Sequence, residues 1–304
     1  MFLLLTQNPN NYTSMRLIEE AKALQLQTKT LNPFQETLSF TQKSHCDKQN
    51  DLKKCIIGLH RSSGVSFDDF DLLVAENLMQ SGILIENNPR VFKKFRDKEK
   101  QSLFFFQKQI PQIPTLCIRG KPTPTILQEA DELFYPHLQE ETFILKTNRG
   151  NRGLGVNIIR GKDSLLSLLE TFWAMNDQRF ILQPYIHRAE EFRVFILKGE
   201  CLGGILKQQP KQFDFRKNSE RIISSPQYFS AKNLPQEILE LSHKTFENSG
   251  AFYLGLDFLI SSEGPLIIEM NCSPGFEQFE KTSRINIANK IIQGLKDSSN
   301  YFKS

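Results

Sequence analysis

The segment from residue 254 to residue 275 constrains the fold more than any other part of the chain; it reads LGLDFLISSEGPLIIEMNCSPG. Two apolar runs, Leu254–Ile260 and Pro265–Met270, flank the sequence Ser-Ser-Glu-Gly. Short apolar runs of this length are typical of strands, and the polar sequence with glycine between them is typical of a hairpin turn. The segment therefore predicts two adjacent antiparallel strands.

Three oxygen-bearing side chains lie in this otherwise apolar hairpin. If the turn centres on Glu263, Asp257 faces Glu269, and Glu269 shares a face with Asn271 because side chains alternate with a period of two. Carboxylate and amide oxygens in this arrangement suit Mg²⁺. The alternative is an exposed strand face with scattered acids, but such acids usually lie beside Lys or Arg, and the segment contains neither.

Length and composition exclude several classes of protein. A chain of 304 residues with 39% hydrophobic and 24% charged residues can bury a large core in two or three subdomains and is not disordered. The net charge of +4 is compatible with a nucleotide or an acidic substrate, but it does not indicate a dedicated nucleic-acid binder. We interpret the basic cluster between residues 93 and 100 as a solvated helix face; it comprises Lys93, Lys94, Arg96, Lys98 and Lys100.

Cysteine usage and hydropathy indicate a cytoplasmic protein that does not interact with membranes. The five cysteines form no CxxC pair, so the sequence suggests neither a disulfide framework nor a zinc site. The apolar start of the chain, Met1–Leu5, is too short for a signal peptide, and no apolar run approaches the length of a membrane span.

The chain opens with a strand–helix–strand pattern. Residues 2–6 are predicted to form a buried strand, Ser14–Leu26 a helix and Thr28–Leu31 a second strand, which is typical of a parallel α/β unit. A single helix is predicted from Arg90 to Gln107. Further strands are predicted at Leu116–Ile118, Phe143–Lys146, Val156–Ile159, Phe180–Ile186, Phe192–Leu197 and Cys201–Lys207.

A glycine-rich loop follows the strand that ends at Lys146, in the sequence KTNRGNRGLG. Gly150, Gly153 and Gly155 permit backbone conformations that let amide groups approach an anion closely, and Lys146 could reach toward phosphate. The sequence lacks the GK[ST] of a Walker A motif, and a strand instead of a helix follows, so it is not a dinucleotide fingerprint. A glycine loop between two strands is typical of a flap that closes over a triphosphate. Without the motifs that follow it, the same loop would indicate an ordinary hairpin.

The order of motifs from Lys146 onward resembles the ATP-grasp superfamily, specifically the RimK-type glutamate ligases. The resemblance runs from about residue 90 to residue 295, and more loosely from residue 1. The segments that carry it are FILK (143–146), RGNRGLG (149–155), ILQPYI (181–186), EEFRVFIL (190–197), FDFRKN (213–218), GLDFL (255–259) and EMNCSPGFEQFEKT (269–282).

The resemblance implies an α/β (α+β) architecture with three parts and an ATP-dependent ligase activity. Residues 1–89 would form an N-terminal parallel-sheet α/β subdomain, residues 90–180 a central lid subdomain, and residues 181–304 a C-terminal mixed-sheet subdomain. Members of the family bind ATP between two subdomains and join a carboxylate to an amine through an acyl-phosphate, releasing ADP and phosphate.

The resemblance also implies roles for individual residues. Lys146 and the glycines of the loop would contact the nucleotide phosphates, and Glu191 would lie near the ribose. Arg193 and Arg216 would act on the γ-phosphate or the acyl-phosphate. The adenine segment and the remaining nucleotide contacts would be Gln183, Pro184, Tyr185, Lys217 and Asn218; the ligands of two Mg²⁺ ions, for which Mn²⁺ can substitute, would be Asp257, Glu269 and Asn271.

Four positions depart from the pattern expected of the family. Pro184 replaces an acidic residue, so a side-chain bond to the adenine amino group is excluded while backbone recognition remains. Glu191 stands in place of the more usual aspartate, and Lys217 in place of a small polar residue. Cys272 replaces a small apolar residue, and we expect it to pack and not to react, because no histidine lies near it in sequence.

The sequence leaves the substrate open. We expect glutamate or another amino acid to be added to a small-molecule carboxylate, a peptide or a protein, and a protein C-terminus is one of the acceptors left open. A glutathione-synthetase-like or dipeptide ligase and a nucleotide-binding module without ligase activity are the alternatives, and a homo-oligomer is left open. The segment His60–Gly64 is a candidate substrate contact or a simple turn.

Overall fold

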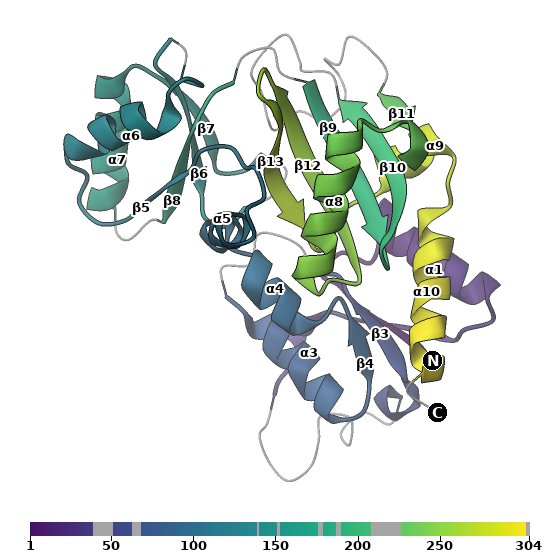
Figure 1. The fold of residues 1–304 in the computed structure, drawn as a ribbon. Coiled ribbons are helices and arrows are strands. Elements are labelled where there is room, and N and C mark those ends of the chain that lie inside the picture. Colours follow the sequence, from purple (N-terminus) through teal and green to yellow (C-terminus); the bar gives the residue numbers. More distant parts are fainter. Residues whose placement is uncertain are drawn as a thin grey trace.

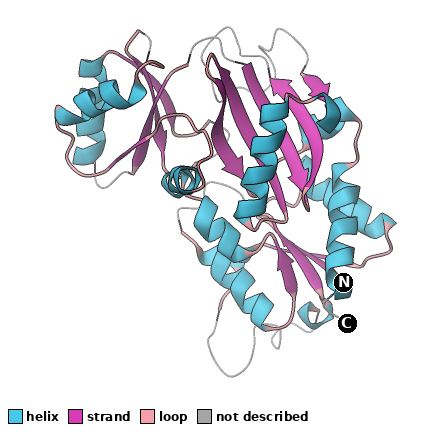
Figure 2. Cartoon of the chain, in the orientation of Figure 1, coloured by secondary structure: helices cyan, strands magenta, loops and turns pink. Residues whose placement is uncertain are grey.

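The computed structural model describes residues 1–38, 51–62, 68–138, 140–150, 153–175, 179–186, 190–207 and 226–301. Three sheets organise these residues, and helices pack against each of them (Figures 1 and 2). Figure 1 shows the first sheet at the base of the molecule, the five-stranded sheet above it, and the remaining sheet to the left.

Sheet A is parallel throughout and has the strand order β2-β1-β3-β4. Its strands are β1 (Phe2–Leu5), β2 (Thr28–Leu31), β3 (Ile57–His60) and β4 (Leu84–Glu86). Helix α1 (Tyr12–Ala23) connects the first two strands, and the side chain of Asn11 caps it by accepting a hydrogen bond from the amide of Ser14 at 2.9 Å. The predicted parallel βαβ opening is confirmed, and the helix begins two residues earlier than expected.

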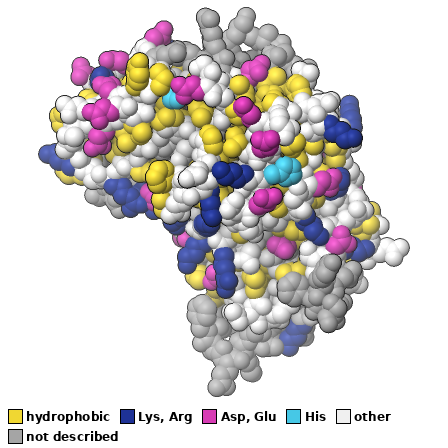
Figure 3. Space-filling model, viewed as in Figure 1, with side chains coloured by type: hydrophobic (Ala, Val, Ile, Leu, Met, Phe, Trp, Pro, Cys, Tyr) yellow, Lys and Arg dark blue, Asp and Glu magenta, His cyan; other side chains and the backbone are white. Residues whose placement is uncertain are grey.

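The predicted helix from Arg90 to Gln107 is in fact two helices, α4 (Pro89–Phe95) and α5 (Lys98–Gln107), which follow α3 (Phe70–Gln80). The break falls at Arg96 and Asp97, where Asp97 has extended backbone angles and its carboxylate binds Arg149 of the glycine loop and Lys100 of α5. The interpretation of the basic cluster as a solvated face holds for Lys93, Lys94 and Lys100, which are exposed. Figure 3 shows basic side chains gathered around α4 and α5 on this face.

Sheet C is antiparallel and has the strand order β5-β8-β6-β7. Its strands are β5 (Leu116–Ile118), β6 (Thr142–Thr147), β7 (Val156–Arg160) and β8 (Phe180–Pro184), and its helices are α6 (Thr125–Phe134) and α7 (Lys162–Ala174). A separate apolar core lies between the helices and the sheet and includes Phe134, Phe143 and Leu182. This part of the chain therefore has its own core.

Sheet B carries the hairpin predicted from the sequence and has the strand order β11-β10-β9-β12-β13. Its strands are β9 (Glu190–Leu197), β10 (Glu200–Lys207), β11 (Gln227–Phe229), β12 (Tyr253–Ser261) and β13 (Gly264–Asn271). All neighbouring strands are antiparallel, and a single parallel bridge between Gln112 and Ile267 extends the edge of the sheet. Helix α8 (Gln236–Ser249) crosses one face (Figure 1) and ends at Gly250, whose φ of 72° is the left-handed conformation that glycine adopts readily.

The two faces of sheet B pack against different parts of the molecule. On one face, Val194, Leu256 and Phe258 share a core with residues of α4, α5 and α8. On the other face, Phe195 and Tyr253 share a core with sheet A, α9 (Glu277–Ser283) and α10 (Ile287–Tyr301). Short 3-10 helices complete the described elements at Pro33–Gln35, Leu52–Lys54 and Ala231–Asn233. Among the described helices, none combines the length and the apolar character needed to cross a bilayer.

Candidate active site

The hairpin formed by β12 and β13 brings Asp257 opposite Glu269, as predicted, but by a different route. The turn is a two-residue loop that places Ser261 opposite Gly264, and a regular ladder continued from there would pair Asp257 with Ile268. The register shifts between Asp257 and Phe258, where Ile268 is the additional residue on β13. This bulge turns Glu269 onto the same face as Asp257, which is a known use of bulges near functional sites.

One half of a single face of sheet B is charged, and the other half is apolar. Along β9, Phe195 packs in the core beneath the sheet, and Arg193 and Glu191 follow on the same face because side chains alternate. Strand pairing places Arg193 next to Asp257 and Glu191 next to Lys207. We call the polar residues of this face the charged strip; it consists of Glu191, Arg193, Lys207, Asp257, Glu269 and Asn271.

Asp257 lies at the centre of the charged strip and is 3% exposed. Arg193 donates two hydrogen bonds to it, from Nε to Oδ1 at 2.7 Å and from a terminal nitrogen to Oδ2 at 2.6 Å, and Lys207 Nζ lies 3.2 Å from Oδ1. Burial alone would raise the pKa of Asp257, but Arg193 and Lys207 hold it below its usual range. The carboxylate is therefore ionised and compensated by cations that the hairpin itself does not contain.

Glu269 and Asn271 complete the oxygen-donor set. The Nδ2 group of Asn271 donates to Glu269 Oε1 at 3.1 Å and approaches Asp257 Oδ2 at 3.4 Å, so the three side chains meet at one point. No cluster of three His, Cys, Asp or Glu residues occurs in the part of the chain that the structure describes. The set is two carboxylates and one amide, and rotation of the amide by 180° would direct its oxygen to the same point.

Lys146 projects from the end of β6 toward the charged strip. Desolvation by burial lowers the pKa of Lys146 to about 8; the carboxylates of Glu269, Glu191 and Asp257 raise it, and the ammonium of Lys98 lowers it. Lys98, the first residue of α5, donates from Nζ to the carbonyl of Gly150 at 3.2 Å. Two lysines thus converge where the glycine loop begins.

The described part of the glycine loop is a tight hairpin that needs its glycines. The amide of Thr147 donates to the carbonyl of Gly155 at 2.9 Å. A Cβ atom at Gly155 would lie 2.2 Å from Thr147 Oγ1, and one at Gly150 would lie 2.7 Å from the carbonyl oxygen of Leu154. Gly153 and Gly155 also have positive φ angles of 76° and 74°. The loop therefore brings its backbone together as only glycine allows.

The segment predicted to contact adenine lies at the end of β8. Gln183 is buried, and its Nε2 donates to Thr115 Oγ1 at 2.8 Å, while the amide of Tyr185 donates to the carbonyl of Thr142 at 2.9 Å. Neither Pro184, which has no amide hydrogen, nor Tyr185 therefore offers its amide to a ligand. Ile186 follows and packs against Leu259 and Ile113 between sheets B and C.

The loops after β3 and β13 meet next to the charged strip. Arg61 donates to Ser273 Oγ at 3.0 Å and to the carbonyl of Pro274 at 3.1 Å. Pro274 lies directly over Gly255, where a Cβ atom would come within 2.7 Å of it. The predicted contact segment His60–Gly64 is described as far as Ser62, and this part borders the loop that follows Asn271.

Cys272 is buried and packs in the core that sheet B shares with α4, α5 and α8, as expected. Burial raises the pKa of its thiol to about 12, so the group stays protonated near neutrality. Its carbonyl accepts a hydrogen bond from the side chain of Asn87. The residue therefore contributes to packing.

Three predicted site residues cannot be placed, and two lysines that were not predicted lie near the site. Arg216, Lys217 and Asn218 lie outside the described residues. Lys207 and Lys98 approach the site without having been predicted. Lys207 had a sequence signal, since it ends a strand whose partner carries Glu191, but the signal for Lys98 was hidden by the mistaken continuous helix.

Comparisons with known proteins agree with this geometry. The family model described as "RimK-like ATP-grasp domain" matches residues 96–295. A protein of Legionella pneumophila (strain Corby) named "Probable alpha-L-glutamate ligase" is 26% identical over 298 residues, which cover 96% of this chain and 94% of that protein. The predicted resemblance to the RimK-type ATP-grasp proteins and the prediction that the protein is a ligase are confirmed.

Solved structures share the fold. The D-alanine–D-alanine ligase of Bacillus anthracis complexed with ATP has a TM-score of 0.71 at 19% identity, covering 99% of this chain and 96% of that chain. The ATP-grasp ligase PsnB complexed with a minimal precursor, Mg and ADP has a TM-score of 0.71 at 15% identity, covering 98% and 97%. The predicted fold class is confirmed: the chain belongs to the RimK-like ATP-grasp family.

Proposed function

We propose that this protein is an ATP- and Mg²⁺-dependent carboxylate–amine ligase that forms an amide bond through an acyl-phosphate. The observation that carries the proposal is the convergence of Asp257, Glu269 and Asn271 from two strands, with Lys146 and Lys98 beside them. Phosphoryl transfer needs charge neutralisation and alignment more than covalent help, and this arrangement supplies both signs of charge at one place.

The donor set fits a hard divalent cation. Asp257, Glu269 and Asn271 would hold Mg²⁺ through oxygen atoms, and Mn²⁺ would be accepted by the same donors. We propose two Mg²⁺ ions, since β12 and β13 each supply a carboxylate, Asp257 and Glu269, that could bind a metal ion. Bound there, the metal would neutralise the phosphate oxygens of ATP. Arg193 compensates the charge of Asp257, and a cation bound by the same carboxylate would share that role.

The nucleotide would extend from the glycine loop to the apolar cluster between sheets B and C. Lys146 and Lys98 would contact its phosphates as point charges, and Glu191 would lie near the ribose. The base would lie against the apolar cluster next to the end of β8, whose members are Ile113, Ile186, Leu259, Leu266 and Ile268. The adenine contact proposed for Gln183, Pro184 and Tyr185 would then come from carbonyl groups and apolar surface, because the amide of Tyr185 is used within sheet C.

The reaction proceeds in two balanced steps. An oxygen of the substrate carboxylate attacks the γ-phosphorus of ATP, and ADP leaves. The amine nitrogen of the second substrate then attacks the acyl carbon, phosphate leaves, and the nitrogen loses a proton. Arg193 would bind phosphate or carboxylate oxygens through its planar fork, and the same role is proposed for Arg216 with Lys217 and Asn218 beside it. The glycine loop would exclude water from the acyl-phosphate.

For the substrates we propose glutamate, or another amino acid, as the residue added, and a peptide, a protein or a small-molecule carboxylate as the acceptor. Support comes from the relatives named "Probable alpha-L-glutamate ligase" and from a structural neighbour, the ATP-grasp ligase PsnB, complexed with a precursor peptide. The loop after β13, held by Arg61, borders the place where an acceptor would enter. We also propose the division into regions 1–89, 90–180 and 181–304; β8, at the second boundary, pairs with β5 and β6 of the middle region.

A mixture of ATP, Mg²⁺, pooled amino acids and candidate acceptors, analysed by mass spectrometry with ADP measured in parallel, tests the proposal. We expect ADP release that depends on one amino acid and one acceptor, and an added mass that identifies the amino acid. A product in which two free amino acids are joined would favour a dipeptide or glutathione-synthetase-like ligase. Tight ATP binding without any product would contradict the ligase proposal and favour a nucleotide-binding module.

A further inference from the structure

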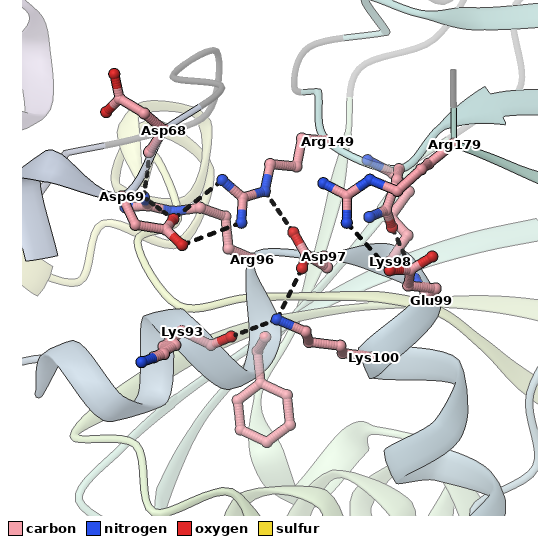
Figure 4. Close-up of polar contacts among 12 residues, drawn as sticks. Asp68, Asp69, Lys93, Arg96, Asp97, Lys98, Glu99, Lys100, Arg149 and Arg179 are labelled. Carbon is pink, nitrogen blue, oxygen red and sulfur yellow. Dashed lines mark hydrogen bonds and ion pairs between the residues drawn. The ribbon is translucent and has the colours of Figure 1, made fainter. Parts of the chain in front are cut away.

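A second group of charges lies outside the charged strip and ties the start of the glycine loop to two helices (Figure 4). Its central residue is Arg149, which follows Lys146 by three positions. Figure 4 shows the guanidinium of Arg149 between the carboxylates of Asp69 and Asp97. We call these three residues the loop clamp.

Asn148, at the start of the glycine loop, accepts hydrogen bonds from the first amides of α5. The first amides of a helix have no partner within it. Here the amide of Lys98 donates to the carbonyl of Asn148 at 3.0 Å, and the amide of Glu99 donates to Asn148 Oδ1 at 3.0 Å. Asp97 occupies the N-cap position but makes no side-chain cap bond, because its carboxylate accepts from Arg149 Nε and pairs with Lys100 at 2.8 Å.

The start of α3 repeats this arrangement. Asp69 is its N-cap residue and also makes no side-chain cap bond. Its carboxylate accepts from two terminal nitrogens of Arg149, at 3.0 and 3.3 Å, and lies 3.1 Å from a terminal nitrogen of Arg96. Arg149 therefore joins two helix starts from different parts of the chain.

The three clamp residues differ in exposure, and this difference makes the clamp testable. The side chain of Arg149 is 10% exposed, that of Asp97 is 2% exposed, and that of Asp69 is 39% exposed. Substitution of Asp69 thus removes the partly exposed pair of Arg149 with Asp69 and leaves the buried pair of Arg149 with Asp97 in place. Substitution of Arg149 removes both arms.

We propose that Arg149 is a positioning residue, which fixes the first limb of the glycine loop and thereby holds Lys98 and Lys146 where the nucleotide phosphates bind. The inference rests on the proposed function for its consequence on ATP. Asp69 extends the clamp to α3, so that the position of the loop depends on the packing of the N-terminal region. A guanidinium is required because it is planar and forked, and can therefore reach two carboxylates at once.

Hydrogen–deuterium exchange of the ligand-free protein tests the clamp without reference to ATP. In peptides that cover residues 143–150, we expect exchange about two- to fivefold faster in Asp69→Asn, as befits the loss of one partly exposed pair. We expect it to be at least about tenfold faster in Arg149→Gln, which opens a buried pair. Arg119→Gln is the matched control, because Arg119 pairs with Glu99 of the same helix at 57% exposure.

Binding of ATP gives the second measurement, by calorimetry in the presence of Mg²⁺. We expect Kd to rise about two- to fivefold in Asp69→Asn, with turnover at saturating ATP within about threefold of the unsubstituted protein, and to rise at least about tenfold in Arg149→Gln. Arg149→Lys keeps the charge but cannot bridge both carboxylates, so it should resemble Arg149→Gln.

Each outcome decides the inference. Exchange rates and Kd values in Asp69→Asn and Arg149→Gln that match those of Arg119→Gln would overturn it. Full ATP affinity in Arg149→Lys would also overturn it, since charge alone would then suffice. If the unsubstituted protein failed to bind ATP, the proposed function would fall, and the exchange measurement would still show whether the clamp holds the loop.

Discussion

The charged strip and the loop clamp are built from the same kinds of side chain but present them differently. In the strip, charges project from the middle of an antiparallel sheet onto one face; cations pair with Asp257 and Glu191, and among the described residues Glu269 accepts a hydrogen bond from Asn271 alone. In the clamp and the adjoining buried pair of Arg96 and Asp71, charges close on one another at helix starts. The strip thus contains one carboxylate, that of Glu269, without an ion pair among the described residues, whereas both carboxylates of the clamp pair with Arg149. An unpaired carboxylate distinguishes a site that can take a ligand from one that holds the structure.

Glu269 illustrates the first case and Asp71 the second. Within the described residues, Glu269 accepts one hydrogen bond, from Asn271. Asp71 is fully buried, accepts two hydrogen bonds from Arg96 at 2.9 and 2.5 Å, and lies 3.0 Å from Nε2 of His60. Substitution of Glu269 should thus change ligand binding, and substitution of Asp71 should change stability.

The largest effect is expected for Glu269→Gln. We expect it to lower kcat/KM for ATP by about 10³-fold, because a neutral amide oxygen binds Mg²⁺ more weakly than a charged carboxylate does. The free energy of unfolding should change by less than about 1 kcal/mol, since no cation of the described chain pairs with Glu269. Steady-state kinetics and urea unfolding measure the two quantities.

Glu200→Gln is the matched control, because Glu200 lies on β10 of the same sheet and is 61% exposed beside Lys290. It should leave both quantities unchanged. Full activity in Glu269→Gln would remove Glu269 from the metal site and erase the distinction between the two regions.

Asp71→Asn should have the next largest effect, on stability. Removal of one partner leaves Arg96 and His60 next to a neutral group in a buried place, which costs about 3 kcal/mol. Urea unfolding at pH 7 checks this, with Asp131→Asn as the control, since Asp131 is 42% exposed in its pair with Lys162. A loss no larger than that of the control would show that the buried pair is not needed for the fold.

The acid stability of the protein should depend on the same carboxylate. Burial opposes ionisation of Asp71, but His60 and Arg96 lower its pKa from 3.8 to about 2. A pKa that is lower in the folded state adds stability above the unfolded pKa, and this stability is lost as the pH falls through the folded pKa. The stabilisation amounts to about 2 kcal/mol.

The difference in unfolding free energy between the unsubstituted protein and Asp71→Asn should therefore be largest above pH 4 and shrink as the pH approaches 2. Burial also lowers the pKa of His60, so the stability of the unsubstituted protein itself decreases as the pH falls below about 6.5. Urea unfolding at pH 6, 4 and 3 measures the difference. A difference independent of pH would mean that Asp71 is not ionised in the folded protein.

The smallest effect is expected for Lys207→Gln in the strip. Lys207 is 23% exposed, and Arg193 keeps both of its bonds to Asp257 without it. We expect Kd for ATP with Mg²⁺ to change by less than about fivefold, as befits a partly exposed ion pair. Arg193→Gln, measured by the same calorimetry, should weaken binding more, and the reverse order would reassign the roles of the two cations.

Much of the fold and the ligand set of the strip followed from local patterns. The βαβ opening and the pairing of β12 with β13 are predicted by apolar runs and turn residues, and these signals come from residues that are close together in the sequence. The position of Glu269 was predicted correctly although the turn was misplaced, because the bulge at Ile268 shifts the ladder by one residue. A bulge has no clear signal in a continuous apolar strand, so this detail was out of reach.

The clamp could not have been predicted in the same way. The break between α4 and α5 lies where Asp97 binds Arg149 and where Asn148, fifty residues after the start of α5, caps that helix; helix periodicity does not report such partners. The same holds for Lys207 and Arg193, whose bonds to Asp257 depend on the order of strands in the sheet. Contacts between distant segments, and not the propensities of single residues, decided these positions.

Diffraction from crystals grown with Mn²⁺ and a non-hydrolysable ATP analogue tests the metal site most directly, because anomalous scattering locates the ion. We expect an anomalous peak about 2.0–2.3 Å from oxygens of Asp257, Glu269 and Asn271, with the analogue's phosphates between that peak and Lys146. A peak elsewhere, or an analogue bound while Arg193 still holds both oxygens of Asp257 and no metal is near, would contradict the assignment of the charged strip.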